Sequence, residues 1–248
     1  MNILAIDSSG LTASVALMKN GLITAEYIVN NKKTHSQTLL PMIDEIMKAS
    51  ETDPKELDGI AISKGPGSFT GLRIGSATAK GLGLALDIPI AEVSTLDALG
   101  YNLYGNEGCI ICPIMDARRQ EVYTAAYEFI PGENSLSDNV YKWKPLRQNK
   151  VIAEQAVPLE KMLKELEMLG KKVIFNGDGV SVYADIISKV FGCEYRFAPK
   201  TLLYQRAGSV AVLGEQILLD NGAVNADEHV PVYLRKSQAE RERDAVRS

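Results

Sequence analysis

The sequence predicts an α/β protein built from two lobes of similar organisation. Short apolar runs bounded by turn residues alternate with longer helix-like patterns, and the order strand, strand, strand, helix, strand, helix occurs twice along the 248 residues. In each half the first apolar run ends in an aspartate, Asp7 in the first half and Asp116 in the second. The two halves share no repeated sequence, so the duplication is predicted from the order of the elements alone.

The first half is expected to open with three strands. The second and third are separated by Asn20-Gly21, which is typical of a tight hairpin. A helix is expected within 34–50, and Pro41 predicts that it bends or begins near that position. The expected strands are 3–6, 12–18, 22–29, 58–63 and 90–93, and the other expected helices are 72–86 and 95–104.

The second half repeats this order after the turn-rich stretch 105–108. The expected strands are 109–115, 122–129, 140–146, 151–153, 172–175 and 194–197, and the expected helices are 158–169, 180–191 and 207–219. We therefore expect an N-terminal lobe over 1–105 and a C-terminal lobe over 106–234. The final helix, 207–219, is a candidate to pack back on the first lobe, and 235–248 reads as a charged tail.

Composition narrows the class of protein. Hydrophobic residues make up 46% and charged residues 23%, which is typical of a globular chain. The formal net charge of −4 argues against a chain that binds nucleic acid by itself. No apolar run approaches the roughly 18 to 20 residues of a membrane span. The N-terminus has no basic start and there are three cysteines, so we expect a cytoplasmic protein with reduced thiols.

Metal ligands are scarce. The chain has two histidines, His35 and His229, so a site with two or three histidine ligands can barely be built. Cys109 and Cys112 have the spacing of a metal or redox pair, but they lie in an apolar run. A spacing of three in a strand places two side chains on opposite faces, which favours a core role. We predict no metal site.

A nucleotide site is one interpretation of the turns. The glycine-rich loop 65–71 opens a helix, where backbone N–H groups can face a phosphate, although it lacks the Gly-Lys-Ser/Thr of a Walker A loop. The plainer alternative is that Asp, Asn and Gly are common turn residues. No nucleophile–base set can be assembled, so no catalytic residue is predicted. The candidate nucleotide-binding residues are Asp7, Gly65, Gly67, Asp116, Gly177 and Asp178.

The two early helices carry more apolar surface than one sheet face requires. The apolar arc of 34–50 spans about 180°, against about 100° for an ordinary surface helix. In 72–86 and the residue before it, small residues recur at Gly71, Gly75, Ala79 and Gly83. Either these helices pack closely on their own sheet, or they form a protein–protein interface. The candidate interface residues are Leu39, Met42, Ile43, Ile46, Met47, Leu72, Gly75, Ala79, Leu82 and Gly83.

Six motifs in order resemble those of the bacterial TsaB family. They are ILAIDSS, HSQTLLPMI, SKGPGSFTGLRIG, DARRQEVY, NGDG and PVYLRKSQAE, and they extend from Ile3 to Glu240. The resemblance implies the two-lobed α/β fold of the actin, sugar kinase and Hsp70 superfamily, with mixed sheets flanked by helices. It also implies a non-catalytic partner of the paralogous transferase TsaD, which forms N6-threonylcarbamoyladenosine at position 37 of tRNAs that read codons beginning with A.

The resemblance further implies how such a subunit assembles. It would pair with TsaD through the N-terminal-lobe helices, form a homodimer when alone, and work with the ATPase TsaE. It would meet tRNA through the complex and have no cofactor of its own, while the complex uses ATP with Mg²⁺. TsaD-like proteins carry H-x-x-x-H on a helix, and here Leu39 stands four residues after His35, so the second metal ligand is absent.

Two alternatives stay open. The chain could be a nucleotide-dependent transferase or kinase, or a metallopeptidase, of the same fold. The basic residues of the tail could contact tRNA phosphates or form a solvated chain end. These tail residues are Arg235, Lys236, Arg241, Arg243 and Arg247.

Overall fold

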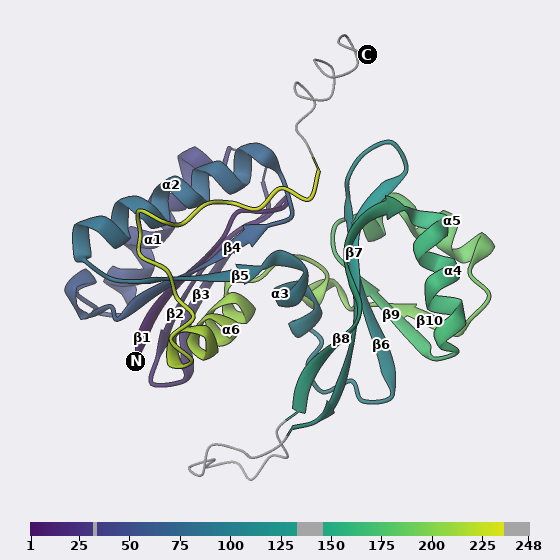
Figure 1. Cartoon of the computed structure of the whole chain (residues 1–248). Helices are drawn as coiled ribbons and strands as arrows, with labels where there is room; N and C mark the ends of the chain where they lie inside the picture. The colour runs from purple at the N-terminus through teal and green to yellow at the C-terminus, as the bar shows by residue number, and fades with distance from the viewer. Residues whose placement is uncertain (32–33, 133–145, 236–248) are drawn as a thin grey trace. The chain divides into compact units, whose positions relative to one another are not determined.

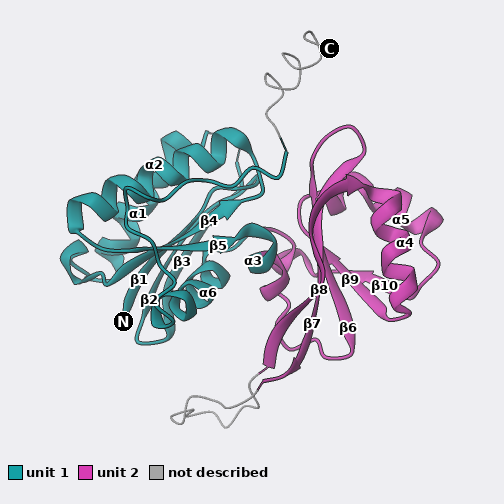
Figure 2. Ribbon diagram, in the orientation of Figure 1, with its two compact units in different colours: residues 1–98, 205–248 teal, residues 99–204 magenta. Residues whose placement is uncertain are grey.

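The computed structural model describes residues 1–31, 34–132 and 146–235. The chain divides into two compact units, which Figure 2 colours separately. Unit 1 combines residues 1–98 with the C-terminal part of the chain from 205, and unit 2 is the continuous stretch 99–204. This division differs from the expected lobes, 1–105 and 106–234, in placing residues 99–105 in unit 2, and it places the last helix in unit 1, the position considered for 207–219 from the sequence.

Unit 1 is built on a five-stranded mixed sheet in the order β3-β2-β1-β4-β5 (Figure 1). β1 pairs antiparallel with β2, and β2 with β3, whereas β1, β4 and β5 run parallel. Asn20 and Gly21 both have positive φ angles, which confirms the hairpin predicted between the second and third strands. The strands are β1 (Asn2–Asp7), β2 (Ala13–Lys19), β3 (Leu22–Val29), β4 (Gly59–Gly65) and β5 (Ile90–Ser94).

Helices cover both faces of this sheet. The side chains of β1 alternate, so that Leu4 and Ile6 pack in the core with α1 (His35–Ala49) and α2 (Phe69–Leu86). The opposite face packs against α6 (Ala207–Leu219) through small residues, and a Cβ built at Gly214 would lie 2.3 Å from the Cβ of Ala61. The sheet is therefore buried on both sides. A short 3₁₀ helix, Pro54–Glu56, precedes β4, and α1 continues through Pro41.

Unit 2 repeats the topology of unit 1. Its sheet has the order β10-β9-β6-β7-β8, in which β6, β7 and β8 are antiparallel neighbours and β6, β9 and β10 are parallel. The repeated element order predicted from the sequence is confirmed. The strands are β6 (Cys109–Asp116), β7 (Glu121–Pro131), β8 (Leu146–Pro158), β9 (Lys172–Asn176) and β10 (Tyr195–Phe197).

Two helices, α4 (Leu159–Leu169) and α5 (Gly179–Val190), pack on one face of this sheet around Phe175. α3 (Thr95–Tyr101) ends earlier than the expected helix 95–104. A 3₁₀ helix, Lys200–Leu202, lies just before the chain passes from unit 2 back to unit 1 at residue 205. β8 is one strand that includes the expected 151–153, while residues 140–145 of another expected strand lie outside the described residues. Among the described helices, none has the length and apolarity that a membrane span requires.

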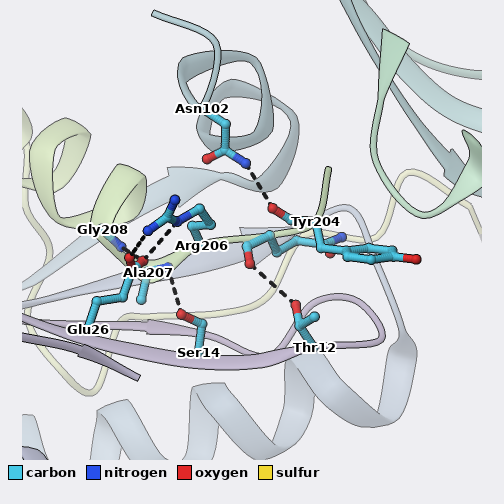
Figure 3. Close-up of polar contacts among 9 residues, drawn as sticks. Thr12, Ser14, Glu26, Asn102, Tyr204, Arg206, Ala207 and Gly208 are labelled. Atoms are coloured by element: carbon cyan, nitrogen blue, oxygen red, sulfur yellow. Dashed lines mark hydrogen bonds and ion pairs between the residues drawn. The ribbon is translucent and has the colours of Figure 1, made fainter. Parts of the chain in front are cut away.

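Polar contacts hold the start of α6 against the sheet of unit 1 (Figure 3). The Glu26 carboxylate on β3 forms an ion pair with Arg206 and accepts a hydrogen bond from the Gly208 N–H at 2.8 Å. The Ala207 N–H donates to the Ser14 hydroxyl at 2.9 Å. A carboxylate at a helix N-terminus satisfies N–H groups that have no partner within the helix, so these bonds fix α6 on the first unit.

Candidate functional site

Asp7 lies at the end of β1 and is fully buried. One carboxylate oxygen accepts hydrogen bonds from the Ser9 N–H at 2.9 Å and the Ser9 hydroxyl at 2.6 Å. The other accepts a hydrogen bond from the Ser63 hydroxyl on β4 at 2.5 Å. Burial raises the pKa of Asp7, and the three hydrogen bonds oppose that rise. Asp7 is thus a well-satisfied internal carboxyl group at the turn between β1 and β2.

The turn after Asp7 is packed directly under the loop that leads to α2. The Ser68 N–H donates to the Ser9 carbonyl at 2.7 Å, and the Ser8 hydroxyl donates to the Gly71 carbonyl at 2.8 Å. Built Cβ atoms at Gly67 and Gly71 would lie 2.2 and 2.1 Å from the carbonyl oxygens of Ser9 and Ser8. Only glycine permits this approach.

The same loop is covered on a second side. Gly65 has a φ of 120°, and its built Cβ would lie 2.3 Å from the Val232 carbonyl. Protein carbonyls therefore occupy the space beside Gly65 and Gly67, the glycines proposed from the sequence as a phosphate cradle. The Ser68 N–H, just before the start of α2, has the Ser9 carbonyl as its acceptor.

The corresponding turn of unit 2 is built differently. The Asp116 N–H donates to the Asp178 carboxylate at 3.3 Å, and the Tyr183 hydroxyl donates to the Asp116 carboxylate at 2.9 Å. Gly177 approaches the carbonyl of Ile114, from which its built Cβ would be 2.3 Å away. Asp116, Gly177 and Asp178 thus come together at one end of the second sheet, as the sequence interpretation requires. Asp7, Gly65 and Gly67 come together in the other unit.

Two titratable groups at the unit 2 turn have displaced pKa values. Burial raises the pKa of Asp178 to about 6, and the negative charge of Asp116 adds to the rise, while backbone N–H groups oppose it. Burial also raises the pKa of Tyr183 to about 12, with the hydrogen bond to Asp116 as a second cause. Arg118 lies 3.5 Å from Asp116 and is largely exposed. This arrangement can hold a proton but contains no nucleophile–base pair.

The histidines take up two separate structural positions. His35 Nε2 lies 2.9 Å from the Gly10 carbonyl, and Leu39, four residues later, is buried in the core. His229 Nδ1 lies 2.6 Å from a Glu92 carboxylate oxygen. Across the described residues, no group of three or more His, Cys, Asp or Glu side chains is arranged to hold a metal ion.

The residues proposed as an interface face inward. Nine of the ten are buried, and Leu82 is partly buried against the same core. The reason is that α1 packs against both the sheet and α2, which buries most of its wide apolar arc within the unit and leaves Leu40 exposed. These residues cannot supply an exposed docking face, and this is a correction to the sequence interpretation. The nine are Leu39, Met42, Ile43, Ile46, Met47, Leu72, Gly75, Ala79 and Gly83.

The exposed faces of the same helices carry a different set of residues. Leu40 on α1 is 55% exposed, and Leu84 on α2 is 61% exposed. Ala77, Gly81 and Ala85 form an exposed row of small residues on α2, and a Cβ built at Gly81 meets no atom within 4 Å. The row shows the same spacing of four as Gly71, Gly75, Ala79 and Gly83. Sequence reasoning chose the inner row and missed the outer one, although both patterns are visible in the chain.

The chain is similar to curated and solved proteins over nearly its whole length. Residues 23–243 match the family model described as TsaD, tRNA N6-adenosine threonylcarbamoyltransferase. The tRNA threonylcarbamoyladenosine biosynthesis protein TsaB of Bacillus subtilis is 35% identical over 97% of this chain and 96% of its own length. The chain belongs to the TsaB family. The TsaB protein of Escherichia coli is 30% identical, with 96% of each chain covered.

A solved member of the family has the same fold. The structure of YeaZ from Pseudomonas aeruginosa superimposes with a TM-score of 0.74 at 26% identity, covering 94% of this chain and 99% of that one. The family predicted from the six motifs is confirmed. The fold is a duplicated α/β fold with two mixed sheets of the same strand order, flanked by helices, as in the YeaZ structure.

Proposed function

We propose that this chain is the non-catalytic subunit that acts with TsaD and TsaE to form the threonylcarbamoyl group on N6 of adenosine 37 in tRNA. Its membership of the TsaB family supports a role in this pathway, because relatives are named for threonylcarbamoyladenosine biosynthesis. The observation that carries the non-catalytic role is the filled turn of unit 1. The Ser9 carbonyl accepts the Ser68 N–H, so this donor near the N-terminus of α2 is not available to a phosphate.

Nucleotide binding in the complex is assigned to the partner subunits. ATP with Mg²⁺ is bound by the partners, and this chain binds no nucleotide of its own, because Asp7 is enclosed by Ser9 and Ser63. Titration of ATP with Mg²⁺ into the purified chain is expected to give no binding. Stoichiometric binding together with turnover would favour the alternative, a nucleotide-dependent enzyme.

Reconstitution tests the central role. TsaD, TsaE, tRNA, ATP and the threonylcarbamoyl donor are combined with and without this chain, and modified adenosine is measured. We expect modification only when the chain is present. We also expect Asp116→Asn to retain full activity, because Asp116 contacts Asp178 and Tyr183 but belongs to no catalytic set. Loss of activity in Asp116→Asn with an unchanged melting temperature would contradict the non-catalytic role.

The partner surface is proposed to be the exposed side of α1 and α2, around Leu40, Gly81 and Leu84. Because TsaD shares the family model, one surface can serve a homodimer and the TsaD heterodimer, and the two assemblies should compete. Leu84→Asp is expected to weaken both. Val182→Asp on α5, an equally exposed apolar helix position in unit 2, is the matched control. A ternary species that keeps the homodimer intact would refute a shared surface.

A further inference from the structure

The C-terminal strap, residues 223–235, runs along α2 in unit 1 and is the yellow segment beside that helix in Figure 1. Near its start, Val224 exchanges two backbone hydrogen bonds of 2.9 Å with Ile90 on β5, the edge strand of the sheet. Further along, the Val232 N–H donates to the Lys64 carbonyl at 2.7 Å. The strap thereby covers an open sheet edge.

Side chains from α2 and β5 fix the middle of the strap. Lys80 on α2 donates to the carbonyl of Asp227 at 2.8 Å and to that of His229 at 3.0 Å. The His229 ring is buried beside Glu92, and its Nε2 has no hydrogen-bond partner within the described residues. Burying an imidazole with one unpaired nitrogen is unfavourable. The other contacts of the strap must therefore outweigh this cost to keep His229 buried.

The outward side of the strap is apolar. Val230 is 63% exposed, and Val232, Tyr233 and Leu234 are between 36% and 39% exposed. A segment that only covered a sheet edge would turn polar side chains to water. Four exposed large apolar residues within five positions, on a firmly anchored backbone, are instead typical of a contact surface.

This apolar strip is continuous with the exposed side of α2. The ring of Tyr233 lies 4.9 Å from that of Phe69, the first residue of α2, and Phe69 is itself 38% exposed. Arg73, one turn further along α2, lies over the Phe69 ring at 3.9 Å. Aromatic rings rimmed by an arginine are common where proteins meet proteins.

We propose that the strap is the second half of the TsaD-docking surface, beside the exposed side of α2. This inference rests on the proposed function and extends it. The occupant is the paralogous partner, because the strip lies against α2 at Phe69 and at Lys80, the helix whose exposed side is the proposed TsaD surface, and Arg73 lies between Phe69 and the outer row of small residues. An apolar strip that is ordered before binding loses little conformational entropy on association, which is the advantage of anchoring it through Lys80 and His229.

The experiment measures the dissociation constant of the full-length chain for TsaD by calorimetric titration. The test variant is the double substitution Val230→Ser with Val232→Ser, and Leu84→Ser tests the α2 face. Val182→Ser, at a site 53% exposed on α5 in unit 2, is the matched control. We expect the double variant to weaken binding tenfold or more, Leu84→Ser to weaken it as well, and the control to match the wild type. The melting temperature of each of the four chains is measured beside the titration, and we expect it to change little, because Val230, Leu84 and Val182 are more than half exposed and Val232→Ser leaves the Val232 backbone hydrogen bond in place.

The outcomes separate the two proposals. Weakening by Leu84→Ser without weakening by the strap variant would overturn the strap proposal and leave the proposed function intact. Failure of the wild-type chain to bind TsaD, or modification that needs no such chain, would overturn both. A strap variant that loses only self-association, or only binding of tRNA to the assembled complex, would assign the strip to a second copy or to RNA and would also overturn the proposal.

Discussion

The two units have one topology but use the turn after their first strand in opposite ways. In unit 1, Gly67 and Gly71 approach the carbonyls of Ser9 and Ser8, which follow Asp7, so the turn is packed shut. In unit 2, Gly177 approaches the carbonyl of Ile114, which precedes Asp116. In unit 2 the glycine therefore meets the first strand before the aspartate instead of after it. Asp116 remains partly exposed at the end of the strand, in contact with Tyr183 and Arg118.

Equivalent turn aspartates of the two units therefore have different surroundings, although the strand order around them is the same. Burial raises the pKa of both Asp7 and Asp178, but three protein donors oppose the rise at Asp7, whereas the negative charge of Asp116 adds to the rise at Asp178. The surroundings differ because the glycines of the strand-to-helix connection approach the first strand after the aspartate in unit 1 and before it in unit 2. Four experiments test the packing and the charges that distinguish the two units.

The largest effect is expected from Gly71→Ala in the sealed turn. The added methyl would lie 2.1 Å from the Ser8 carbonyl, so the turn or α2 must shift, and the loss of stability should reach about 3 kcal/mol. Gly81→Ala is the matched control on the same helix, since its Cβ meets open space, and it should gain up to about 1 kcal/mol. Denaturant unfolding measures both. Equal stabilities for the two variants would mean that the turn is not closely packed.

Asp178→Asn should stabilise the protein at neutral and alkaline pH. Burial raises the pKa of this carboxyl from 3.8 to about 6, so the folded state retains a proton that the unfolded state releases as pH rises from about 4 to about 6. Stability conferred by the wild-type group is therefore lost across that interval. Two pKa units correspond to about 2 to 3 kcal/mol, so the variant should gain about 2 kcal/mol at pH 8 and almost nothing at pH 4.

Urea unfolding at pH 4, 6 and 8 tests this expectation. Asp185→Asn, at an exposed position on the same helix, provides the control for the loss of one carboxyl group. A gain for Asp178→Asn that stayed constant from pH 4 to pH 8 would rule out titration as the cause.

A smaller effect is expected at α6, the C-terminal helix that packs on the sheet of unit 1 and has no counterpart among the described residues of unit 2. Glu26→Gln removes the charge that pairs with Arg206 but keeps an oxygen for the Gly208 N–H, so the loss should be about 1 kcal/mol. The melting temperature should fall by a few degrees, and the fall should shrink in high salt because the pair is partly exposed. No change at low salt would mean that α6 is held by its apolar face alone.

The smallest effect concerns the strand that carries Asp116. Burial raises the pKa of the Cys112 thiol to about 12, so this cysteine should not react with a thiol reagent in the folded protein at pH 8. Cys109 and Cys193 are half-buried and should react first. Thiol counting in native and denatured protein should give two rapid sites and then three. Single substitutions of Cys109 and Cys193 by serine assign the rapid sites.

The order of elements could be predicted because it depends on local signals. Asn20-Gly21 and the apolar runs ending at Asp7 and Asp116 predict a hairpin and two equivalent strands, and the structure confirms them. Local signals also brought Asp116 and Asp178 into one candidate site, and their N–H to carboxylate contact is present.

The candidate interface could not be predicted, because periodicity shows that a helix face is apolar but not which neighbour covers it. Gly75 and Gly81 look alike in the sequence, yet one would place a Cβ 2.3 Å from the Ser8 hydroxyl and the other would place it in solvent. The strap was missed for a related reason. Its place is set by contacts such as Lys80 with His229, which are 149 residues apart and leave no local pattern.

The return of the chain to unit 1 has a consequence for synthesis on the ribosome. Residues 99–204 form unit 2 without a break, so this unit can finish folding while the first still lacks α6. The face of the first sheet that includes Ala5, Ala61 and Val93 then has no helix over it. Translation of those 106 residues takes roughly 5 to 20 seconds at about 5 to 20 residues per second. During that interval the nascent chain presents an open apolar sheet, and a holding chaperone would find its target there.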